Sequence, residues 1–204
     1  TRLADFAARE LACFEQSPEE DPALDASCRE IARRLGAAGF LEPCCIMDPA
    51  GRFDLRKLAL SRDTLARQAG LADFVFGMQG LGTGPVSLFG SPAQRQHVLP
   101  GVVSGAKIGA FALSEPEAGS DVAAMATTAR RDGDGWRLDG VKTWISNGGL
   151  ADHYVVFARS GEAPGSRGLS AFLVDSGTPG LEIESRVEIT VRHGALLGST
   201  SFPF

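Results

Sequence analysis

Apolar side chains recur at helical spacing through the first hundred residues of this 204-residue chain. Between residues 21 and 39 they follow steps of four, three and four, the spacing of one helix face, at Leu24, Cys28, Ile31 and Leu35. Asp21-Pro22 supplies a cap followed by proline at the first helical position, and Gly39 supplies a stop. These signals predict a helix over that interval.

The same reasoning predicts further helical segments, over about 3–14, 54–70 and 91–100. Asp54 caps the second of these, and Ser91-Pro92 caps the third, which should end near Leu99-Pro100. A glycine-rich apolar stretch over 71–84 continues the helical pattern, with one stripe formed by Phe74, Met78 and Leu81. The first half of the chain is therefore predicted to be helical.

After Lys107 the pattern changes to short β-type runs, which cover 108–113, 127–131, 136–139, 153–159, 169–175 and 181–187. Asp132-Gly133-Asp134-Gly135 joins two of them and is a strong hairpin signal. Helices first and strands afterwards predict an α+β fold: an all-helical domain over 1–105, then an antiparallel β-barrel or sandwich-like domain over 106–188. A Rossmann fold is disfavoured because helices and strands do not alternate.

Composition and charge narrow the classes of partner. The net charge is −5 and basic residues do not cluster, which argues against nucleic acid and anionic membranes. No apolar stretch in the sequence is long enough to span a bilayer. The four cysteines, at positions 13, 28, 44 and 45, fit no zinc-site spacing, so we expect them to be reduced and mostly buried.

The run from Phe111 to Asp121 reads Phe-Ala-Leu-Ser-Glu-Pro-Glu-Ala-Gly-Ser-Asp. Pro116 favours a strand end in an irregular turn, and Gly119 allows an unusual backbone geometry. Such a strand end leaves N–H groups without sheet partners, and Ser114 adds a hydroxyl beside them. The run could therefore bind a ligand, or it could be a turn with a local cap and no ligand.

A second run, from Val141 to Gly148, reads Val-Lys-Thr-Trp-Ile-Ser-Asn-Gly. Trp144 lies between β-type residues, where a tryptophan serves either as core or as a stacking platform. Ser146-Asn147-Gly148 is a good turn signal and nothing more by itself. Taken singly, neither run establishes a cofactor.

Taken together, the two runs resemble the flavin-contacting segments of the acyl-CoA dehydrogenase family. The resemblance extends from about Leu3 to Val187 and is weaker in the helices, which lack the family's usual acidic-aromatic-glycine loop near Pro43. It implies FAD as the cofactor, with six contacting residues: Phe111, Leu113, Ser114, Trp144, Ile145 and Ser146. It also implies that Ser114 bonds the pyrimidine side of the ring, that Ser146 lies near N5, and that Ser120 touches the pantetheine arm of CoA.

The reaction of that family is α,β-dehydrogenation of an acyl-CoA thioester. A base removes the proton beside the thioester carbonyl while hydride leaves the next carbon for flavin N5, so fixed N–H and O–H donors lower the barrier. The resemblance implies that this base belongs to a third, all-helical domain after the strands, so no catalytic residue is assigned here. Glu115 and Glu117 belong to the flavin run and are not proposed as the base. The lone His193 receives no role, and no metal site is expected.

The resemblance also implies that the complete protein passes electrons to an electron-transfer flavoprotein and forms a homotetramer. We expect the bacterial cytoplasm rather than the mitochondrial matrix. Residues 189–204 do not resemble the family's next strands, so we expect a truncation or a frameshift near residue 188. For the chain as it stands, we expect poor FAD retention and no turnover.

Two other functions stay open. A flavin-dependent monooxygenase of the same architecture would use reduced flavin and oxygen, although Ser120 lies where a CoA arm would pass and favours the dehydrogenase. A non-catalytic truncated remnant would lack the base, and the sheet face that packs on the third domain would be apolar and exposed.

Overall fold

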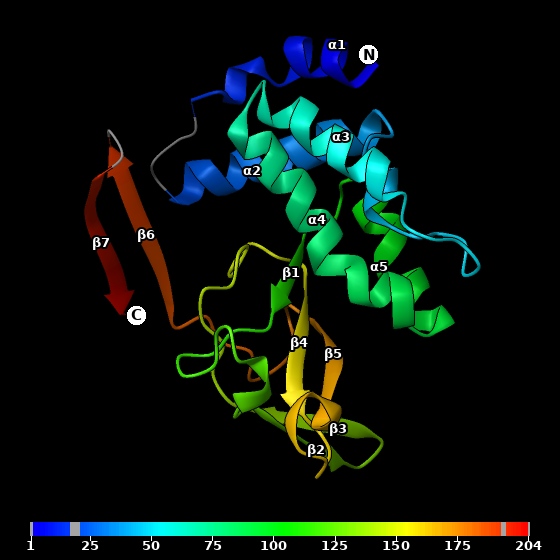
Figure 1. Ribbon diagram of the computed structural model, residues 1–204, viewed down its shortest axis with the longest axis vertical. Helices are drawn as coiled ribbons and strands as arrows, with labels where there is room; N and C mark the ends of the chain where they lie inside the picture. The colour runs from blue at the N-terminus through cyan, green and yellow to red at the C-terminus, as the bar shows by residue number, and fades with distance from the viewer. Residues whose placement is uncertain (1, 17–20, 193–194, 204) are drawn as a thin grey trace.

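The computed structural model describes residues 2–16, 21–192 and 195–203, with side chains for 2–16 and 22–184. Helices gather at one end of the molecule and a sheet lies at the other (Figure 1). The helices at that end are α1 (Arg2–Glu10), η1 (Ala12–Phe14), α2 (Asp21–Ala37), η2 (Glu42–Cys44), α3 (Leu55–Ala66), α4 (Gly70–Phe89) and α5 (Pro92–Val103). Two short 3-10 helices, η3 (Val122–Ala124) and η4 (Gly165–Gly168), lie between the strands. The predicted α+β class, with helices first and strands second, is confirmed.

Two helices begin where the capping residues predict. Asp54 Oδ1 accepts a 2.9 Å hydrogen bond from the backbone N–H of Lys57, and α3 begins at the next residue. Ser91 and Gln94 form a capping box at the start of α5, each side chain bonded to the backbone of the other residue. Both caps satisfy N–H groups that a helix start would otherwise leave without partners.

The end of α5 differs from the prediction. The helix continues past Pro100 to Val103, so the expected end near Leu99-Pro100 was wrong. A proline removes one helical hydrogen bond. The last turn still forms, since Val102 is fully buried and the Ser104 N–H bonds the Pro100 carbonyl at 3.0 Å.

Helix α4 crosses the sheet and contributes much of the core. Its buried face includes Ala72, Val75, Phe76, Gln79, Thr83 and Val86. Two members of the predicted apolar stripe lie at the surface instead, with Phe74 37% and Leu81 45% exposed. At the crossing, a Cβ on Gly82 would lie 2.6 Å from the carbonyl carbon of Gly109, so only glycine permits this approach.

The main sheet has five strands: β1 (Gly109–Ala112), β2 (Thr128–Asp132), β3 (Gly135–Asp139), β4 (His153–Arg159) and β5 (Leu169–Asp175). The predicted β2–β3 hairpin is confirmed, with Asp132 paired to Gly135 across its turn. Strand β4 pairs with β1, β2 and β5 and therefore organises the sheet.

The sheet is mixed, so the expectation of a purely antiparallel domain was wrong in this respect. Strands β1 and β4 run parallel, with Gly109 opposite His153, and β2 meets β4 in parallel at the pair Thr128–Arg159. Only β3 with β2 and β5 with β4 pair antiparallel in this sheet of the described residues. Parallel neighbours need a long crossover, which residues 113–152 supply.

The predicted strand over 181–187 was wrong in its limits. Strand β6 spans Ser185–Arg192 and pairs antiparallel with β7 (Ala195–Pro203) as a separate two-stranded sheet, which stands beside the body of the molecule (Figure 1). Leu181 instead closes a turn, with its N–H bonded to the Thr178 carbonyl at 3.1 Å. The alternating apolar residues of this stretch do not share one strand face. Leu181 packs against a buried cluster of the sheet, whereas Ile183 is 40% exposed.

Alternate residues of β4 face opposite sides of the sheet. One side joins the larger core shared with the helices, which contains Val155, Phe157, Ile31, Phe76 and Leu99. The other side forms a smaller cluster of Ala110, Ala112, Ala151, Tyr154 and Val156. The helices therefore cover one sheet face, and the smaller cluster lies on the opposite one.

All four cysteines are free, and Cys28, Cys44 and Cys45 are buried while Cys13 is exposed. Burial raises the pKa of Cys45 to about 11 and raises that of Cys44 further. The expectation that most of the thiols are buried is confirmed, and the two buried vicinal thiols are protonated at neutral pH.

Candidate functional site

The two runs singled out in the sequence lie side by side. We call residues 111–121 the first segment and residues 141–148 the second segment. The backbone N–H of Thr143 donates to the Ser114 carbonyl at 3.0 Å. Lys142 Nζ donates to the Leu113 carbonyl at 3.0 Å and to Glu115 Oε1 at 2.8 Å. The strand end and the loop are therefore joined directly.

The other end of the second segment is held as well. Asn147 Nδ2 donates to the Gly109 carbonyl at 3.0 Å, at the start of β1. Just beyond it, the Gly149 N–H donates to the Tyr154 hydroxyl at 3.0 Å. The second segment is thus fixed to β1 at both ends and to β4 beside it.

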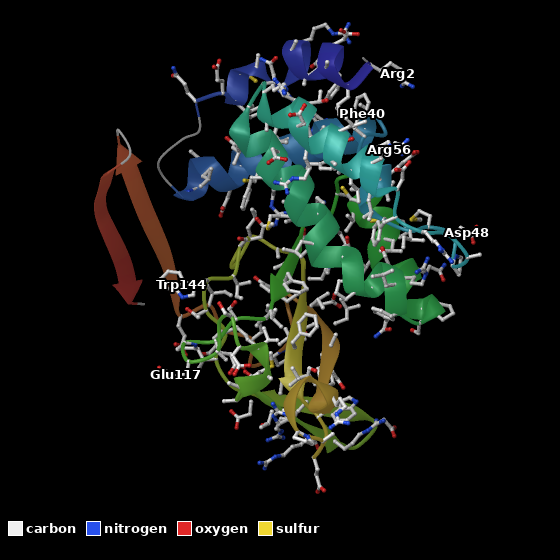
Figure 2. All side chains as sticks on the ribbon, in the orientation of Figure 1. Arg2, Phe40, Asp48, Arg56, Glu117 and Trp144 are labelled. Atoms are coloured by element: carbon white, nitrogen blue, oxygen red, sulfur yellow. The ribbon has the colours of Figure 1, made fainter. Side chains whose placement is uncertain are left out.

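Between these anchors the backbone adopts an uncommon conformation. Trp144 has φ 58° and Asn147 has φ 63°, the only positive-φ residues other than glycine in the part of the chain that the structure describes. Asparagine tolerates this region, whereas a bulky residue there costs free energy and commonly marks a functional site. The Trp144 side chain is also 69% exposed, at the edge of the β domain (Figure 2). A strained and exposed tryptophan is unlike a core residue.

Three of the residues assigned by resemblance line one large cavity, of about 1400 Å³. These are Trp144, Ile145 and Ser146. The cavity reaches from the smaller cluster to the helices, since its wall also includes Ala112, Tyr154, Val156, Leu24 and Phe74. The cavity is large enough to admit a cofactor or a substrate, and charged residues such as Asp132, Arg137 and Lys142 line it beside the apolar ones.

The remaining assigned residues do not line that cavity. Phe111 faces the helical side of the sheet, where its ring packs on Phe157 with centroids 4.9 Å apart. Leu113 and Ser114 are half-buried at the strand end, and Ser120 is exposed in the turn beyond it. The structure joins Ser114 to the second segment through its backbone, while the roles of these four side chains stay predictions.

The polar groups at this junction suit a flat ring with polar edges. Among the described residues, neither the Ser114 hydroxyl nor the Ser146 hydroxyl has a hydrogen-bond partner, so both are free to bond a ligand. Trp144 offers an exposed aromatic surface next to them. The residues present therefore fit a flavin ring, whose faces are apolar and whose edges carry hydrogen-bonding atoms.

Glu115 has a structural role that the sequence did not reveal. Its carboxylate is buried and accepts hydrogen bonds from the N–H groups of Ala126 and Thr127, at 2.6 and 3.0 Å, besides the Lys142 contact. Burial alone would raise the pKa of Glu115, but these hydrogen bonds outweigh it and lower the pKa to about 2. Burial lowers the pKa of Lys142. The Glu115 carboxylate is therefore fully occupied by hydrogen bonds within the protein. Glu117, by contrast, is exposed (Figure 2).

Sequence reasoning missed this ion pair because its partners stand 27 residues apart. One signal was available for Lys142 alone, which interrupts a run of small and apolar residues, whereas Glu115 has a second carboxylate, Glu117, two residues away. A charge in such a place is seldom buried unless it is paired.

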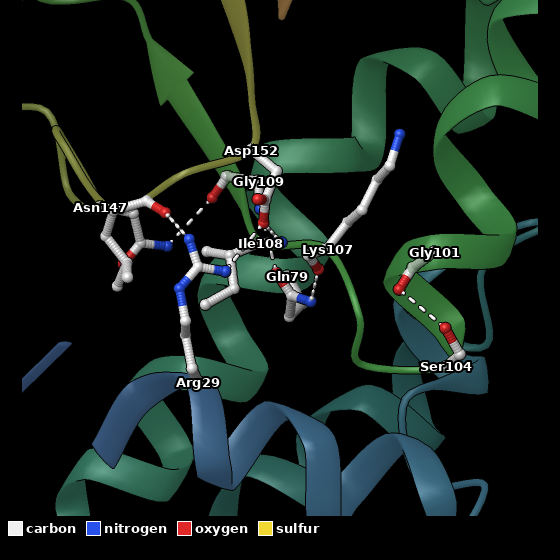
Figure 3. A network of polar contacts seen from close by, with 10 residues as sticks. Arg29, Gln79, Gly101, Ser104, Lys107, Ile108, Gly109, Asn147 and Asp152 are labelled. Carbon is white, nitrogen blue, oxygen red and sulfur yellow. Dashed lines mark hydrogen bonds and ion pairs between the residues drawn. The ribbon is translucent and has the colours of Figure 1, made fainter. Parts of the chain in front are cut away.

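A polar junction joins the helices to the same loop (Figure 3). Arg29 of α2 donates to Asp152 Oδ2 at 3.1 Å and to the Leu150 carbonyl at 2.7 Å. Asp152 Oδ2 also accepts a 2.8 Å bond from the Ile108 N–H. The start of β1 and the end of the loop are therefore held by one arginine from the helical domain.

Gln79 of α4 makes the second connection (Figure 3). Its Nε2 donates to the Lys107 carbonyl at 2.7 Å, and its Oε1 accepts from the Gly109 N–H at 3.2 Å. The carbonyl of the same Gly109 accepts the Asn147 bond. Helix α4, the first residue of β1 and the second segment thus form one hydrogen-bonded chain.

Within residues 2–16, 21–192 and 195–203, no group of three or more His, Cys, Asp and Glu side chains is arranged to hold a metal ion. In the same residues, no helix combines the length and the apolar character needed to cross a membrane. His193, given no role from the sequence, lies outside the described residues.

Comparison with known proteins identifies the family. A family model described as "Acyl-CoA dehydrogenase, N-terminal domain" matches residues 1–106, and one described as "Acyl-CoA dehydrogenase, middle domain" matches residues 110–202. The chain belongs to the acyl-CoA dehydrogenase family. The resemblance inferred from the two segments is therefore confirmed.

Individual acyl-CoA dehydrogenases and related proteins agree with this assignment. The human mitochondrial short-chain specific acyl-CoA dehydrogenase is 36% identical over 181 residues, which cover 88% of this chain and 43% of that protein. The crystal structure of an acyl-CoA dehydrogenase complexed with FAD from Bacillus anthracis has a TM-score of 0.70 and 30% identity, covering 93% of this chain and 31% of that one. The structure of PigA with FAD and proline also has a TM-score of 0.70, with 27% identity, covering 93% and 49%. The present chain spans less than half the length of each.

Proposed function

We propose that this chain is the FAD-binding part of an enzyme that dehydrogenates an acyl-CoA thioester between its α and β carbons. The observation that carries the proposal is the direct bonding of the two segments, through Thr143 to Ser114 and through Lys142 to Leu113. These bonds hold the backbone of Ser114 next to the loop that carries the exposed indole and the Ser146 hydroxyl. The family assignment supplies the chemistry.

The residues of the chain would hold and orient the cofactor. The Ser114 hydroxyl would donate to the pyrimidine edge of the flavin, and Ser146 would bond near N5. Trp144 would pack on the ring, with Leu113 and Ile145 as its apolar surroundings. Phe111 is the assignment that this geometry supports least, because it packs on Phe157 at the helical side of the sheet. When bound, FAD supplies the hydride-accepting atom, while fixed donors stabilise the charge that develops on its pyrimidine side. Ser120 would contact the pantetheine arm of CoA.

The rest of the proposal concerns the whole protein. Its catalytic base would be a carboxylate outside this chain, on an all-helical third domain. Electrons would pass to an electron-transfer flavoprotein, and four copies would assemble. We also propose the division into 1–105, 106–188 and an atypical tail over 189–204, and the bacterial cytoplasm as the compartment.

The fold by itself does not select the substrate, because PigA, similar in fold to this chain, has been solved with FAD and proline. We favour acyl-CoA because the human short-chain specific relative shares 36% identity over most of this chain. A monooxygenase would require reduced flavin and oxygen, and a non-catalytic remnant would bind flavin poorly or act only as a scaffold.

The first prediction tests cofactor and substrate separately. Titrating the purified chain with FAD should give saturable quenching of flavin fluorescence. In an intact relative, Ser114→Ala and Trp144→Ala at the matching positions should weaken FAD binding or slow turnover, measured as anaerobic bleaching of the flavin by butyryl-CoA. Unchanged affinity and rate in both variants would contradict the assigned roles, and absence of FAD quenching would support the remnant.

A further inference from the structure

We propose that Glu115 and Lys142 are a positioning pair that holds the Trp144 turn against the end of β1, so that both segments contact one flavin. The inference rests on the proposed function in one respect, namely that the ligand of this surface is FAD. Lys142 also lines the cavity, but its ammonium is bonded to Leu113 and Glu115, so neither residue of the pair is proposed to bond the cofactor. They act through the segments that they join.

The contacts of Lys142 reach both the backbone and a side chain of the first segment. Its ammonium donates to the Leu113 carbonyl at 3.0 Å and to the Glu115 carboxylate at 2.8 Å. The two side chains are only 11% and 5% exposed, so water competes little for these bonds. Hydrogen bonds between charged groups in such surroundings are the stronger kind.

Glu115 also bonds a third piece of backbone, besides the first and second segments. Its two oxygens accept from the N–H groups of Ala126 and Thr127, immediately before β2. Its own backbone exchanges two hydrogen bonds with Ala118, of 3.0 and 3.1 Å, which close the turn of the first segment. One carboxylate therefore fixes the end of β1, the approach to β2 and, through Lys142, the second segment.

The turn that follows Lys142 needs such constraints. Trp144 stands two residues later at φ 58°, and a bulky residue keeps that conformation only where its surroundings enforce it. On one side of Trp144 the constraints are the Lys142 contacts and the Thr143–Ser114 bond, and on the other side the Asn147–Gly109 bond. These side-chain bonds are all partly buried, and only those of Lys142 involve charged groups. We infer that they set the conformation in which the indole and the Ser146 hydroxyl are presented.

A purely structural ion pair would have different consequences. It would lower stability when broken, yet the folded fraction would bind FAD as before and the second segment would keep its protection. A positioning pair changes the second segment itself. The two cases are separated by measuring the folded protein, not by its yield.

The test uses the whole chain with three substitutions. Lys142→Met removes the ammonium and keeps the stem, and Lys142→Arg keeps the charge and the donors. Arg67→Met is the matched control, since it breaks an exposed ion pair with Asp63 on α3, away from the cavity. Hydrogen exchange of the cofactor-free proteins measures the exchange rates of the backbone amides at residues 143–148. Fluorescence titration gives the FAD dissociation constant.

We expect Lys142→Met to speed exchange at 143–148 and to weaken FAD binding, each by about tenfold or more. Lys142→Arg should stay within about threefold of wild type, and Arg67→Met should match wild type in both measurements. If Lys142→Met fails to fold, the double variant Glu115→Gln/Lys142→Met replaces it, because it leaves no unpaired buried charge.

Three results would overturn parts of this account, and they are distinguishable. If the wild-type protein shows no FAD binding, the proposed function is refuted. Hydrogen exchange then still decides whether the Glu115–Lys142 pair constrains residues 143–148. Wild type that binds FAD, with Lys142→Met or the double variant binding equally well, refutes the positioning role alone. Unchanged hydrogen exchange at residues 143–148 in those variants refutes the proposal that the Glu115–Lys142 pair constrains the second segment.

Discussion

At the scale of single residues, Trp144 carries most of the functional signal. It combines a positive φ with an exposed aromatic ring, and each feature alone is unfavourable for a residue that serves only the fold. The sequence marked Trp144 as either core or stacking platform, and the exposure excludes the core. What holds it in place is a set of bonds from its neighbours, Lys142, Thr143 and Asn147.

The second prediction separates the strain at Trp144 from its proposed use. Trp144→Gly should be more stable than Trp144→Ala by about 1 kcal/mol, because glycine adopts positive φ without cost. Both variants should bind FAD about tenfold more weakly than wild type, because both lack the ring. Chemical denaturation and FAD titration measure the two effects. Equal stabilities would mean that the backbone relaxes in the alanine variant, and wild-type affinity would remove Trp144 from the site.

At the scale of elements, the crossing of α4 over β1 decides how the helical part meets the sheet. Gly82 allows the two backbones to touch, and Gln79, one helical turn earlier, bonds both Lys107 and Gly109. Because Gly109 also bonds Asn147, the position of α4 is linked to that of the second segment. Gly82 is therefore required for this packing contact.

The third prediction tests that crossing. Gly82→Ala should lower the free energy of unfolding by about 1–3 kcal/mol, since its Cβ would overlap the backbone of β1. Gly80→Ala is the control within the same helix, because its Cβ would lie at an ordinary 3.9 Å from Cys44. That change should be neutral or stabilising by about 1 kcal/mol. Equal effects in urea denaturation would show that the contact at Gly82 is not limiting.

At the scale of the whole molecule, the helices and the sheet share one core. Val155 and Phe157 of β4 pack in the same cluster as Ile31 and Phe76 of the helices. Arg29 and Gln79 add hydrogen bonds across the same boundary, and His97 of α5 adds an exposed contact to Asp175 of β5 at 3.0 Å. We therefore expect residues 1–175 to unfold as one cooperative unit.

The fourth prediction is that acid weakens this unit in two pH ranges. His153 is fully buried, and burial first, then Lys107, lowers its pKa from 6.5 to about 4, so its contribution to stability is complete above pH 6.5 and is lost between 6.5 and 4. The pKa of Glu115 falls from 4.5 to about 2, so its contribution is lost between pH 4.5 and 2. His153→Leu should flatten the first range and Glu115→Gln the second, measured as the free energy of unfolding against pH. Parallel curves for wild type and variants would contradict the assignment.

Local features of the sequence were enough for much of this description. Asp54 and Ser91 cap helices where they were expected to, and the Asp132–Gly135 turn forms its hairpin. The limits of β4 and β5 agree with the predicted runs over 153–159 and 169–175. Caps, turns and periodicity act over a few residues, so they can be read from the order of the residues alone. The resemblance of the two segments also gave the family, which the comparisons confirmed.

The tertiary structure decided what depends on residues far apart in the chain. Strand β1 pairs in parallel with β4, whose first residue is 44 positions further on, and no local pattern fixes that partner or its direction. The Glu115–Lys142 pair, the exposed stripe on α4 and the strained Trp144 are likewise invisible until the backbone folds. Burial and pairing are properties of neighbours in space, so the sequence by itself determined the elements and the family, while the fold determined which side chains meet and under what strain.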